Sequence, residues 1–185
     1  MDKTVLYRQL SSPLGKMLLT SDGQALTGLF MTRLAEGSAP EFGSTWRQSD
    51  EPFRAVCAQL TAYFEGEAHG FDLAMELAGT PFQKRVWREL CSIPYGCAIS
   101  YAELARRIGQ PGSSRAVGGA NGRNPISIIV PCHRVIAADG GLGGYGGGLD
   151  RKRWLLEHEA EVLARHPQWR SAPFPGSITP RLLAV

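Results

Sequence analysis

The stretch SYAELARRIGQPGSSRAVGGANG, residues 100–122, predicts two short helices joined by a tight turn. Ser100 is a favourable N-cap for YAELARRIG, and Gly109 is typical of the residue that ends such a helix. Ser113 or Ser114 then begins a second helix through RAVGGAN. Two short helices around a glycine-containing turn are typical of DNA-binding helix-turn-helix units and also of ordinary helical hairpins. The pattern alone leaves both interpretations open.

Further helices flank this pair, within a mostly helical domain expected over residues 80–165. Thr80 and Pro81 suit the N-cap and first position of a helix that runs through PFQKRVWRELCSI and stops near Pro94. Downstream, the buried run SIIV leads to PCHRVI, a loop follows with seven glycines between positions 140 and 148, and RKRWLLEHEAEVLA forms a final amphipathic helix. The Pro-rich tail, residues 166–185, is expected to be irregular.

The N-terminal part, residues 1–79, is predicted to be a small strand-rich α/β domain. The segments TVLYRQL, KMLLT and ALTGLF are separated by the turn sequences SSPLG and SDG, which is the pattern of an antiparallel meander. Residues 33–50 are expected to form a loop. A helix follows with Phe53, Val56, Leu60 and Phe64 on one face, and FDLAMEL alternates like a half-buried strand. The fold class is therefore α+β.

The charges are distributed unevenly between the two halves. The 185-residue chain has a net charge of +3, which divides into −4 over residues 1–80 and +7 over residues 81–185, and sixteen of the twenty basic residues are Arg. This asymmetry predicts that the C-terminal half meets an anion, with nucleic acid the first candidate. With 43% hydrophobic residues, no long apolar run and no apolar N-terminal segment, we expect a cytoplasmic protein with a buried core and no membrane partner.

Cysteine and histidine stand side by side at Cys132-His133. The neighbouring His133 and Arg134 could lower the thiol pKa, and a thiolate is a strong nucleophile. Adjacent residues of a strand point to opposite faces, so His133 helps Cys132 only if the backbone bends or a water bridges them, and Pro131 indicates an irregular segment. The alternative is that Cys132 is a small core residue. Packing is the expected role of the remaining cysteines, Cys57, Cys91 and Cys97.

The motifs around these residues resemble those of the O6-alkylguanine-DNA alkyltransferases. The resemblance extends over residues 80–160 in order and spacing, and its parts are Arg115-Ala116-Val117-Gly118-Gly119-Ala120, Asn124-Pro125, Pro131-Cys132-His133-Arg134-Val135, Tyr145-Gly146-Gly147-Gly148 and Leu155-Leu156-Glu157-His158-Glu159. It implies a ribonuclease H-like N-terminal domain and a C-terminal domain with a winged helix-turn-helix-like unit.

The resemblance also assigns roles to residues. Cys132 would accept the alkyl group in an in-line displacement, His133 would remove the thiol proton through a bound water, and Glu159 would orient the imidazole. Tyr101 would contact the base and donate a proton, and Arg115 would fill the stack vacated by the flipped nucleotide. Taken alone, Tyr101 would be a packing residue, Glu159 a solvated charge, and Arg115 a phosphate contact or a surface charge.

The remaining implied contacts form two groups. The DNA-binding group on the second short helix comprises Ser114, Ala116, Gly118 and Gly119. The substrate-pocket group comprises Asn124, Val135, Tyr145 and Gly146. Carbonyls of Cys132 and Val135 would accept from the guanine exocyclic amine, and Gly146 stands where many members carry Ser.

The implied partner is duplex DNA that contains O6-alkylguanine, with O4-alkylthymine a second substrate class. No cofactor and no metal are expected, because the four cysteines form no CxxC pair. A monomer is expected in solution, with cooperative assembly on DNA left open. Two other function classes are weighed: a helix-turn-helix protein that binds damage without repairing it, against which the presence of Cys132 argues, and a Cys-His hydrolase, which would turn over many times.

Overall fold

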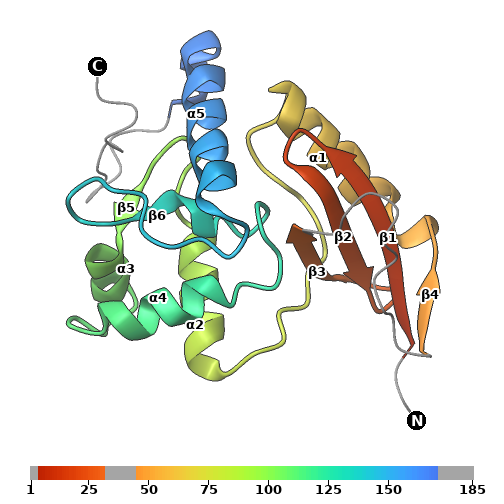
Figure 1. Ribbon diagram of the computed structural model, residues 1–185, viewed down its shortest axis with the longest axis horizontal. Helices are drawn as coiled ribbons and strands as arrows, with labels where there is room; N and C mark the ends of the chain where they lie inside the picture. The colour runs from red at the N-terminus through yellow and green to blue at the C-terminus, as the bar shows by residue number, and fades with distance from the viewer. Residues whose placement is uncertain (1–3, 32–44, 171–185) are drawn as a thin grey trace. The chain divides into compact units, whose positions relative to one another are not determined.

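The protein folds as two compact units, which Figure 1 shows as a computed structural model. The structure describes residues 4–31 and 45–170. The first unit runs to Ala78 and includes Pro125–Ser127, and the second comprises Gly79–Asn124 and the chain from Ile128 onward. No helix of the described segments is both long and apolar enough to cross a bilayer.

A four-stranded sheet forms the first unit. Its strands are β1 (Val5–Ser12), β2 (Gly15–Ser21), β3 (Leu26–Met31) and β4 (Trp46–Gln48), in the order β3-β2-β1-β4. The antiparallel meander of the first three strands is confirmed. The prediction of a loop over 33–50 is wrong for residues 46–48, which form β4 and pair in parallel with β1. Residues 33–44 of this predicted loop lie outside the described residues.

Helix α1 (Arg54–Glu65) accompanies this sheet after a short 3-10 turn, η1 (Glu51–Phe53), and confirms the helix predicted there. Figure 1 shows it lying along the sheet. The strand expected at FDLAMEL is wrong: only Met75 forms a bridge, with Leu26, and the adjacent edge of β3 is extended by a Leu29–Ile126 bridge. The alternation of polar and apolar residues in FDLAMEL therefore reflects partial burial of this segment, which pairs with β3 only at Met75.

The second unit is built on four helices: α2 (Pro81–Cys91), α3 (Tyr101–Arg107), α4 (Ser114–Gly122) and α5 (Leu149–Arg165). The predicted N-caps are confirmed at Thr80, whose side chain forms a reciprocal capping box with Gln83, and at Ser100, whose Oγ accepts from the Glu103 N–H at 3.0 Å. Helix α2 ends at Cys91, three residues before Pro94. After α5, the short 3-10 helix η3 (Pro167–Trp169) corrects the expectation of a wholly irregular tail, while residues 171–185 lie outside the described part.

Two very short strands connect the helix pair to the Cys132 segment. β5 (Ile99–Ser100) and β6 (Val135–Ile136) pair in parallel, with Ile99 opposite Val135. Since β5 leads directly into Tyr101 and β6 follows directly from Cys132–Arg134, this pairing brings two segments about thirty residues apart to one place.

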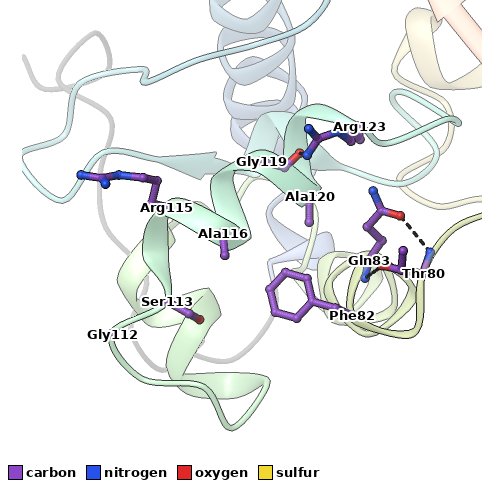
Figure 2. A pocket seen from close by; sticks show the side chains of 10 residues that line it. All are labelled: Thr80, Phe82, Gln83, Gly112, Ser113, Arg115, Ala116, Gly119, Ala120 and Arg123. Atoms are coloured by element: carbon purple, nitrogen blue, oxygen red, sulfur yellow. Dashed lines mark hydrogen bonds between the residues drawn. The ribbon is translucent and has the colours of Figure 1, made fainter.

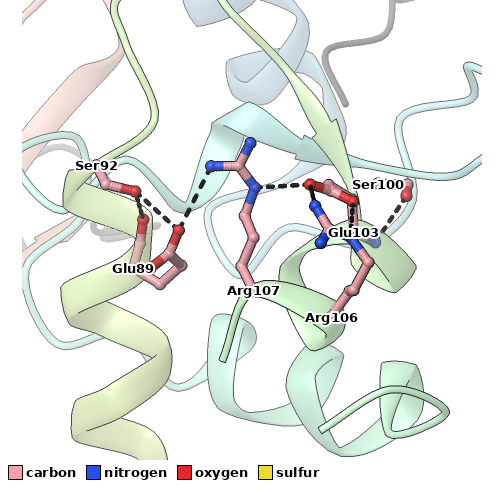
Figure 3. A network of polar contacts seen from close by, with 6 residues as sticks. All are labelled: Glu89, Ser92, Ser100, Glu103, Arg106 and Arg107. Atoms are coloured by element: carbon pink, nitrogen blue, oxygen red, sulfur yellow. Dashed lines mark hydrogen bonds and ion pairs between the residues drawn. The ribbon is translucent and has the colours of Figure 1, made fainter. Parts of the chain in front are cut away.

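An ion-pair network fastens α2 to α3 on the surface (Figure 3). Arg107 lies between Glu89 of α2, at 3.5 Å, and Glu103 of its own helix, at 2.8 Å. Arg106 also binds Glu103, and these hydrogen bonds lower the pKa of Glu103 to about 2. Because Glu103 and both guanidiniums belong to α3, the Arg107–Glu89 ion pair is the contact of this network that joins α3 to α2.

Candidate active site

Cys132 lies on a sharp bend rather than on a strand. Pro131 has φ −81° and ψ 63°, the geometry of an inverse γ-turn, and the Cys132 N–H donates to the Val130 carbonyl at 2.8 Å. Cys132–Arg134 then form a 3-10 turn, η2, in which the Val135 N–H donates to the Cys132 carbonyl. The irregular segment expected from Pro131 is therefore confirmed. Because Cys132 and His133 lie in a turn and not in a strand, their side chains need not point to opposite faces.

Glu159 of α5 is the centre of a buried polar cluster under this bend. Its Oε1 lies 2.7 Å from Nε2 of His133, and both side chains are fully buried. Arg134 donates to the same carboxylate at 2.9 and 3.0 Å and to the Ile93 carbonyl at 2.7 Å. The Gly96 N–H donates to Oε2 at 2.8 Å. The charged guanidinium of Arg134, the imidazole of His133 and a backbone donor therefore hold Glu159, which satisfies the requirement for burying a charge.

These surroundings determine the protonation states of the cluster. Burial alone raises the pKa of Glu159, but the charges of Arg134 and His133 outweigh it and the pKa is lowered well below its usual range. Burial lowers the pKa of His133, and the carboxylate opposes that shift without reversing it. The imidazole is therefore neutral near pH 7 and donates its Nε2 hydrogen to Glu159. Its other nitrogen, Nδ1, is a buried acceptor with no hydrogen-bond partner in the described structure, as a general base requires.

Cys132 itself is only 4% exposed. Burial raises the pKa of the thiol, while hydrogen bonds from Asn124 and Tyr145 and the positive charge of Lys152 act in the opposite sense. Asn124 also donates to the Val130 carbonyl at 2.7 Å, which ties the end of α4 to the bend. The thiol is thus protonated at rest and surrounded by groups that stabilise a thiolate once the proton leaves.

Tyr101 approaches Cys132 from the start of α3. Its hydroxyl donates to the Gly144 carbonyl at 3.3 Å, and burial, together with the charge of Cys132, raises the pKa of the phenol, so it stays protonated. Gly143 lets the loop pass close to this ring: its φ is +66°, and a Cβ there would lie 2.9 Å from the ring. Only glycine tolerates both conditions.

A cavity of about 490 Å³ opens above the bend. It is of a size usual for small-molecule pockets. Several predicted residues line it, together with three that were not predicted; the lining comprises Tyr101, Ser114, Arg115, Gly118, Asn121, Gly122, Gly144 and Tyr145. The other predicted residues that are buried, and that do not line this cavity, are Cys132, His133, Glu159, Asn124 and Val135. Gly146 is not among its lining residues, although a Cβ there would lie 3.6 Å from the Gly122 carbonyl oxygen.

A second hollow, of about 650 Å³, lies on the other side of α4. Figure 2 shows Ala116 and Ala120 facing it together with Phe82, while the Arg115 side chain extends away from the helix. Arg115 is exposed and makes no hydrogen bond or ion pair with any other described residue. Its guanidinium is therefore available to a ligand.

The glycines of α4 are not required by packing within the protein. A Cβ at Gly118 would lie 3.7 Å from the Tyr101 ring, which is ordinary contact, and one at Gly119 would meet only the mobile end of Arg123 at 3.3 Å. Glycine inside a helix costs about 0.5–1 kcal/mol relative to alanine. The fold thus accepts this cost at the half-buried Gly118 and the exposed Gly119, where small residues leave room for an external surface to approach.

Comparison with known proteins decides the family. The model described as the DNA-binding domain of 6-O-methylguanine DNA methyltransferase matches residues 81–161, and the model of its ribonuclease-like domain matches residues 5–77. The chain belongs to this methyltransferase family. The α+β class predicted from sequence, with a ribonuclease-like N-terminal part and a DNA-binding C-terminal part, is thereby confirmed.

Individual members of the 6-O-methylguanine DNA methyltransferase family are closely similar. A methylated-DNA–protein-cysteine methyltransferase of Mycobacterium tuberculosis is 51% identical over 153 residues, 83% of this chain and 91% of the relative. One from Methanosarcina acetivorans is 48% identical over 154 residues, 83% and 97% of the two chains. The solved structure of Mycobacterium tuberculosis OGT in complex with DNA aligns with a TM-score of 0.76 at 50% identity, covering 85% of this chain and 94% of that one.

Three polar residues at this site of the methyltransferase were not predicted from the sequence: Asn121, Arg134 as a partner of Glu159, and Lys152. Lys152 is fully buried and its Nζ donates to the carbonyls of Val135, Leu142 and Gly144 at 2.6, 2.5 and 3.2 Å. Burial lowers its pKa to about 8. The sequence could have indicated that Lys152 is buried, because its spacing from Leu155, Leu156 and Glu159 is that of positions i, i+3, i+4 and i+7, which share one helix face. Among the described residues, no group of three or more His, Cys, Asp or Glu side chains is arranged to hold a metal.

Proposed function

We propose that this chain repairs O6-alkylguanine in duplex DNA by transferring the alkyl group irreversibly to Cys132. The observation that carries the proposal is the neutral His133, whose Nδ1 is buried and unpartnered while Nε2 is held by Glu159. This pairing leaves one acceptor nitrogen on the residue that follows Cys132 in the η2 turn, and Asn121, which lines the cavity, donates to the Cys132 carbonyl. A thiol, a base and an orienting carboxylate in this order are the elements of nucleophilic catalysis.

The transfer step balances as a simple displacement. His133 takes the thiol proton through a water, and the sulfur forms a bond to the alkyl carbon. The bond from that carbon to O6 breaks, and its electron pair stays on the guanine, which takes up one proton to become ordinary guanine. The product on the protein is a thioether, which is chemically inert, so each molecule reacts once.

Tyr101 is the proposed donor of the proton to the departing base. Its raised phenol pKa keeps it protonated, and it lies at the pocket with its hydroxyl on the Gly144 carbonyl. A phenol in this position would stabilise the negative charge that develops on the guanine in the transition state. Lys152, 5.9 Å from the Tyr101 ring centre, adds a positive charge on the same side.

Helix α4 is the proposed DNA-contact element. Its exposed residues Ala116 and Gly119 suit close approach to a minor groove, the half-buried Gly118 lines the cavity on the other side, and Ser114 lies at its first turn. The target nucleotide must leave the duplex to reach Cys132, and the unpaired guanidinium of Arg115 would occupy its place in the stack. We further propose a monomer in solution, with cooperative assembly on DNA undecided, and a cytoplasmic location.

The test is incubation with duplex DNA that carries O6-methylguanine with a labelled methyl group. Label is expected to move to protein at no more than one equivalent and to map to the peptide that contains Cys132. Cys132→Ser is expected to abolish the transfer while DNA binding persists. Several turnovers per protein would favour the hydrolase, and binding without transfer would favour the damage-recognition protein.

A further inference from the structure

One buried carboxylate oxygen serves both Arg134 and His133. Oε1 of Glu159 lies 2.7 Å from Nε2 of His133 and accepts from Nη2 of Arg134 at 2.9 Å. Nε of Arg134 donates to the other oxygen, Oε2, at 3.0 Å, so the guanidinium binds the carboxylate through two parallel hydrogen bonds. Its Nη1 donates to the Ile93 carbonyl at 2.7 Å, and its Cζ lies 5.5 Å from the centre of the Tyr95 ring. The guanidinium is therefore fixed in place against Glu159.

The charge state of the imidazole depends on this guanidinium. An arginine side chain stays protonated in proteins, so Arg134 and Glu159 neutralise each other and His133 needs no charge. Without the guanidinium, the carboxylate would draw a proton to the imidazole, because an opposite charge at hydrogen-bond distance favours the charged form. An imidazolium has no acceptor nitrogen and cannot take a proton from Cys132.

The other charged and titratable groups of the cluster do not replace Arg134. Burial is the main reason that the pKa of His133 is low; Glu159 opposes this shift, and Arg134 and, to a smaller extent, Lys152 act with it. The Lys152 ammonium is engaged with three backbone carbonyls. Burial raises the pKa of Tyr95 and of Cys91, so these two neighbours of Arg134 are neutral.

We infer that Arg134 is a positioning residue that keeps His133 neutral by holding the charge of Glu159. Its side chain is not among those that line the cavity of about 490 Å³, so it acts through the carboxylate rather than on the substrate. The imidazole thereby remains available as a base at a lower pH than it would beside an unpaired carboxylate. The inference rests on the proposed function and adds to it the residue that sets the pH range of the transfer.

The test is the pH dependence of alkyl transfer from free O6-benzylguanine, measured from about pH 5 to pH 9. In the wild type the rate should rise as His133 loses its proton. In Arg134→Met the midpoint of this rise is expected to move up by about one pH unit or more, since the carboxylate then stabilises the imidazolium. Arg134→Lys retains the charge and should move the midpoint by less than about half a unit.

A midpoint is independent of how much active protein a variant yields, so it separates this role from a purely structural one. Structural damage would lower the rate at every pH and leave the midpoint in place. Arg106→Met removes the same charge from a side chain of α3 that is 65% exposed, and it should not move the midpoint. If Arg134→Met does not fold, as circular dichroism would show, Arg134→Gln is measured instead, with the same upward shift expected.

A second readout needs no alkyl transfer. The imidazole of His133 is titrated by nitrogen-15 NMR in Cys132→Ser, with and without Arg134→Met, and the same upward shift is expected. An unmoved midpoint in Arg134→Met, or an equal shift in Arg134→Lys, would overturn the inference. If the proposed function itself failed, the wild type would transfer no label, whereas the NMR titration would still show the effect of Arg134 on His133.

Discussion

The imidazole of His133 and the carboxylate of Glu159 share a hydrogen bond of 2.7 Å in a place where neither side chain reaches solvent. The two residues are 26 positions apart and come from different elements, η2 and α5. Because Arg134 binds the same carboxylate, Glu159 stays ionised while the imidazole stays neutral.

Glu159→Gln is expected to slow alkyl transfer by roughly tenfold or more, since the imidazolium that forms during proton removal loses its counter-charge. The free energy of unfolding should also fall by about 3–5 kcal/mol, because Arg134 remains buried without its partner. The lowered pKa of Glu159 gives stability that is present above the unfolded carboxyl pKa and lost as pH falls. In urea unfolding, the difference in free energy of unfolding between the wild type and Glu159→Gln should therefore decrease below about pH 4. An equal difference at pH 3 and pH 7 would contradict this.

Lys152→Met tests the charge next to Cys132. Lys152 has a pKa of about 8, so below that pH it is positive and favours the thiolate, and above it this support is lost. The variant is expected to react about tenfold more slowly at pH 7, because the forming thiolate loses its positive neighbour. The difference in rate between Lys152→Met and the wild type should narrow above pH 8. Rates with free O6-benzylguanine from pH 6 to 9.5 measure it, and a gap that widens at high pH would exclude the charge effect.

Gly143→Ala and Gly146→Ala form a matched pair in one loop. At Gly143 a Cβ would lie 2.9 Å from the Tyr101 ring at a φ of +66°, so alanine must displace the ring or the loop. At Gly146 the nearest atom is 3.6 Å away. We expect Gly143→Ala to destabilise the protein by about 1–3 kcal/mol and to impair transfer. Gly146→Ala should remain within about 0.5 kcal/mol of the wild type in thermal unfolding.

Gly119→Ala is expected to separate stability from DNA binding. The new methyl group needs only a small shift of the Arg123 side chain, and alanine favours the helix by about 0.5–1 kcal/mol. The melting temperature should therefore rise, while affinity for duplex DNA falls because the helix can no longer approach the groove closely. Reaction with free O6-benzylguanine is the control and should be unchanged. Unaltered DNA affinity would mean that this face of α4 does not meet DNA.

Arg115→Ala is expected to slow repair in duplex DNA by about tenfold or more, because the vacated stack is no longer filled. The reaction with free O6-benzylguanine needs no flipping and should be nearly unaffected. Arg123→Ala removes the same charge from the opposite end of the same helix and is the matched control, which should alter binding mainly through its salt dependence. Equal losses on both substrates would assign Arg115 a structural role.

The sequence by itself determined most of the local elements and indicated the proposed nucleophile. Thr80, Ser100 and the turn glycines marked helix starts and stops because capping depends on neighbours a few residues away, and the Cys132 motif pointed to the chemistry. Helix periodicity could have shown that Lys152 shares the buried face of Glu159, although nothing local distinguishes a buried lysine from a surface one.

Only the tertiary structure decided which polar groups meet and in what state. It placed Glu159 against His133 and Arg134 and gave Lys152 three carbonyl acceptors. Asn121 Oδ1 and His133 Nδ1 have no hydrogen-bond partner among the residues that the structure describes. Part of the predicted loop forms strand β4, and FDLAMEL pairs with another strand only at Met75. The physical reason is that strand pairing, burial and pKa depend on atoms that are distant in sequence, and the packed fold alone brings those atoms together.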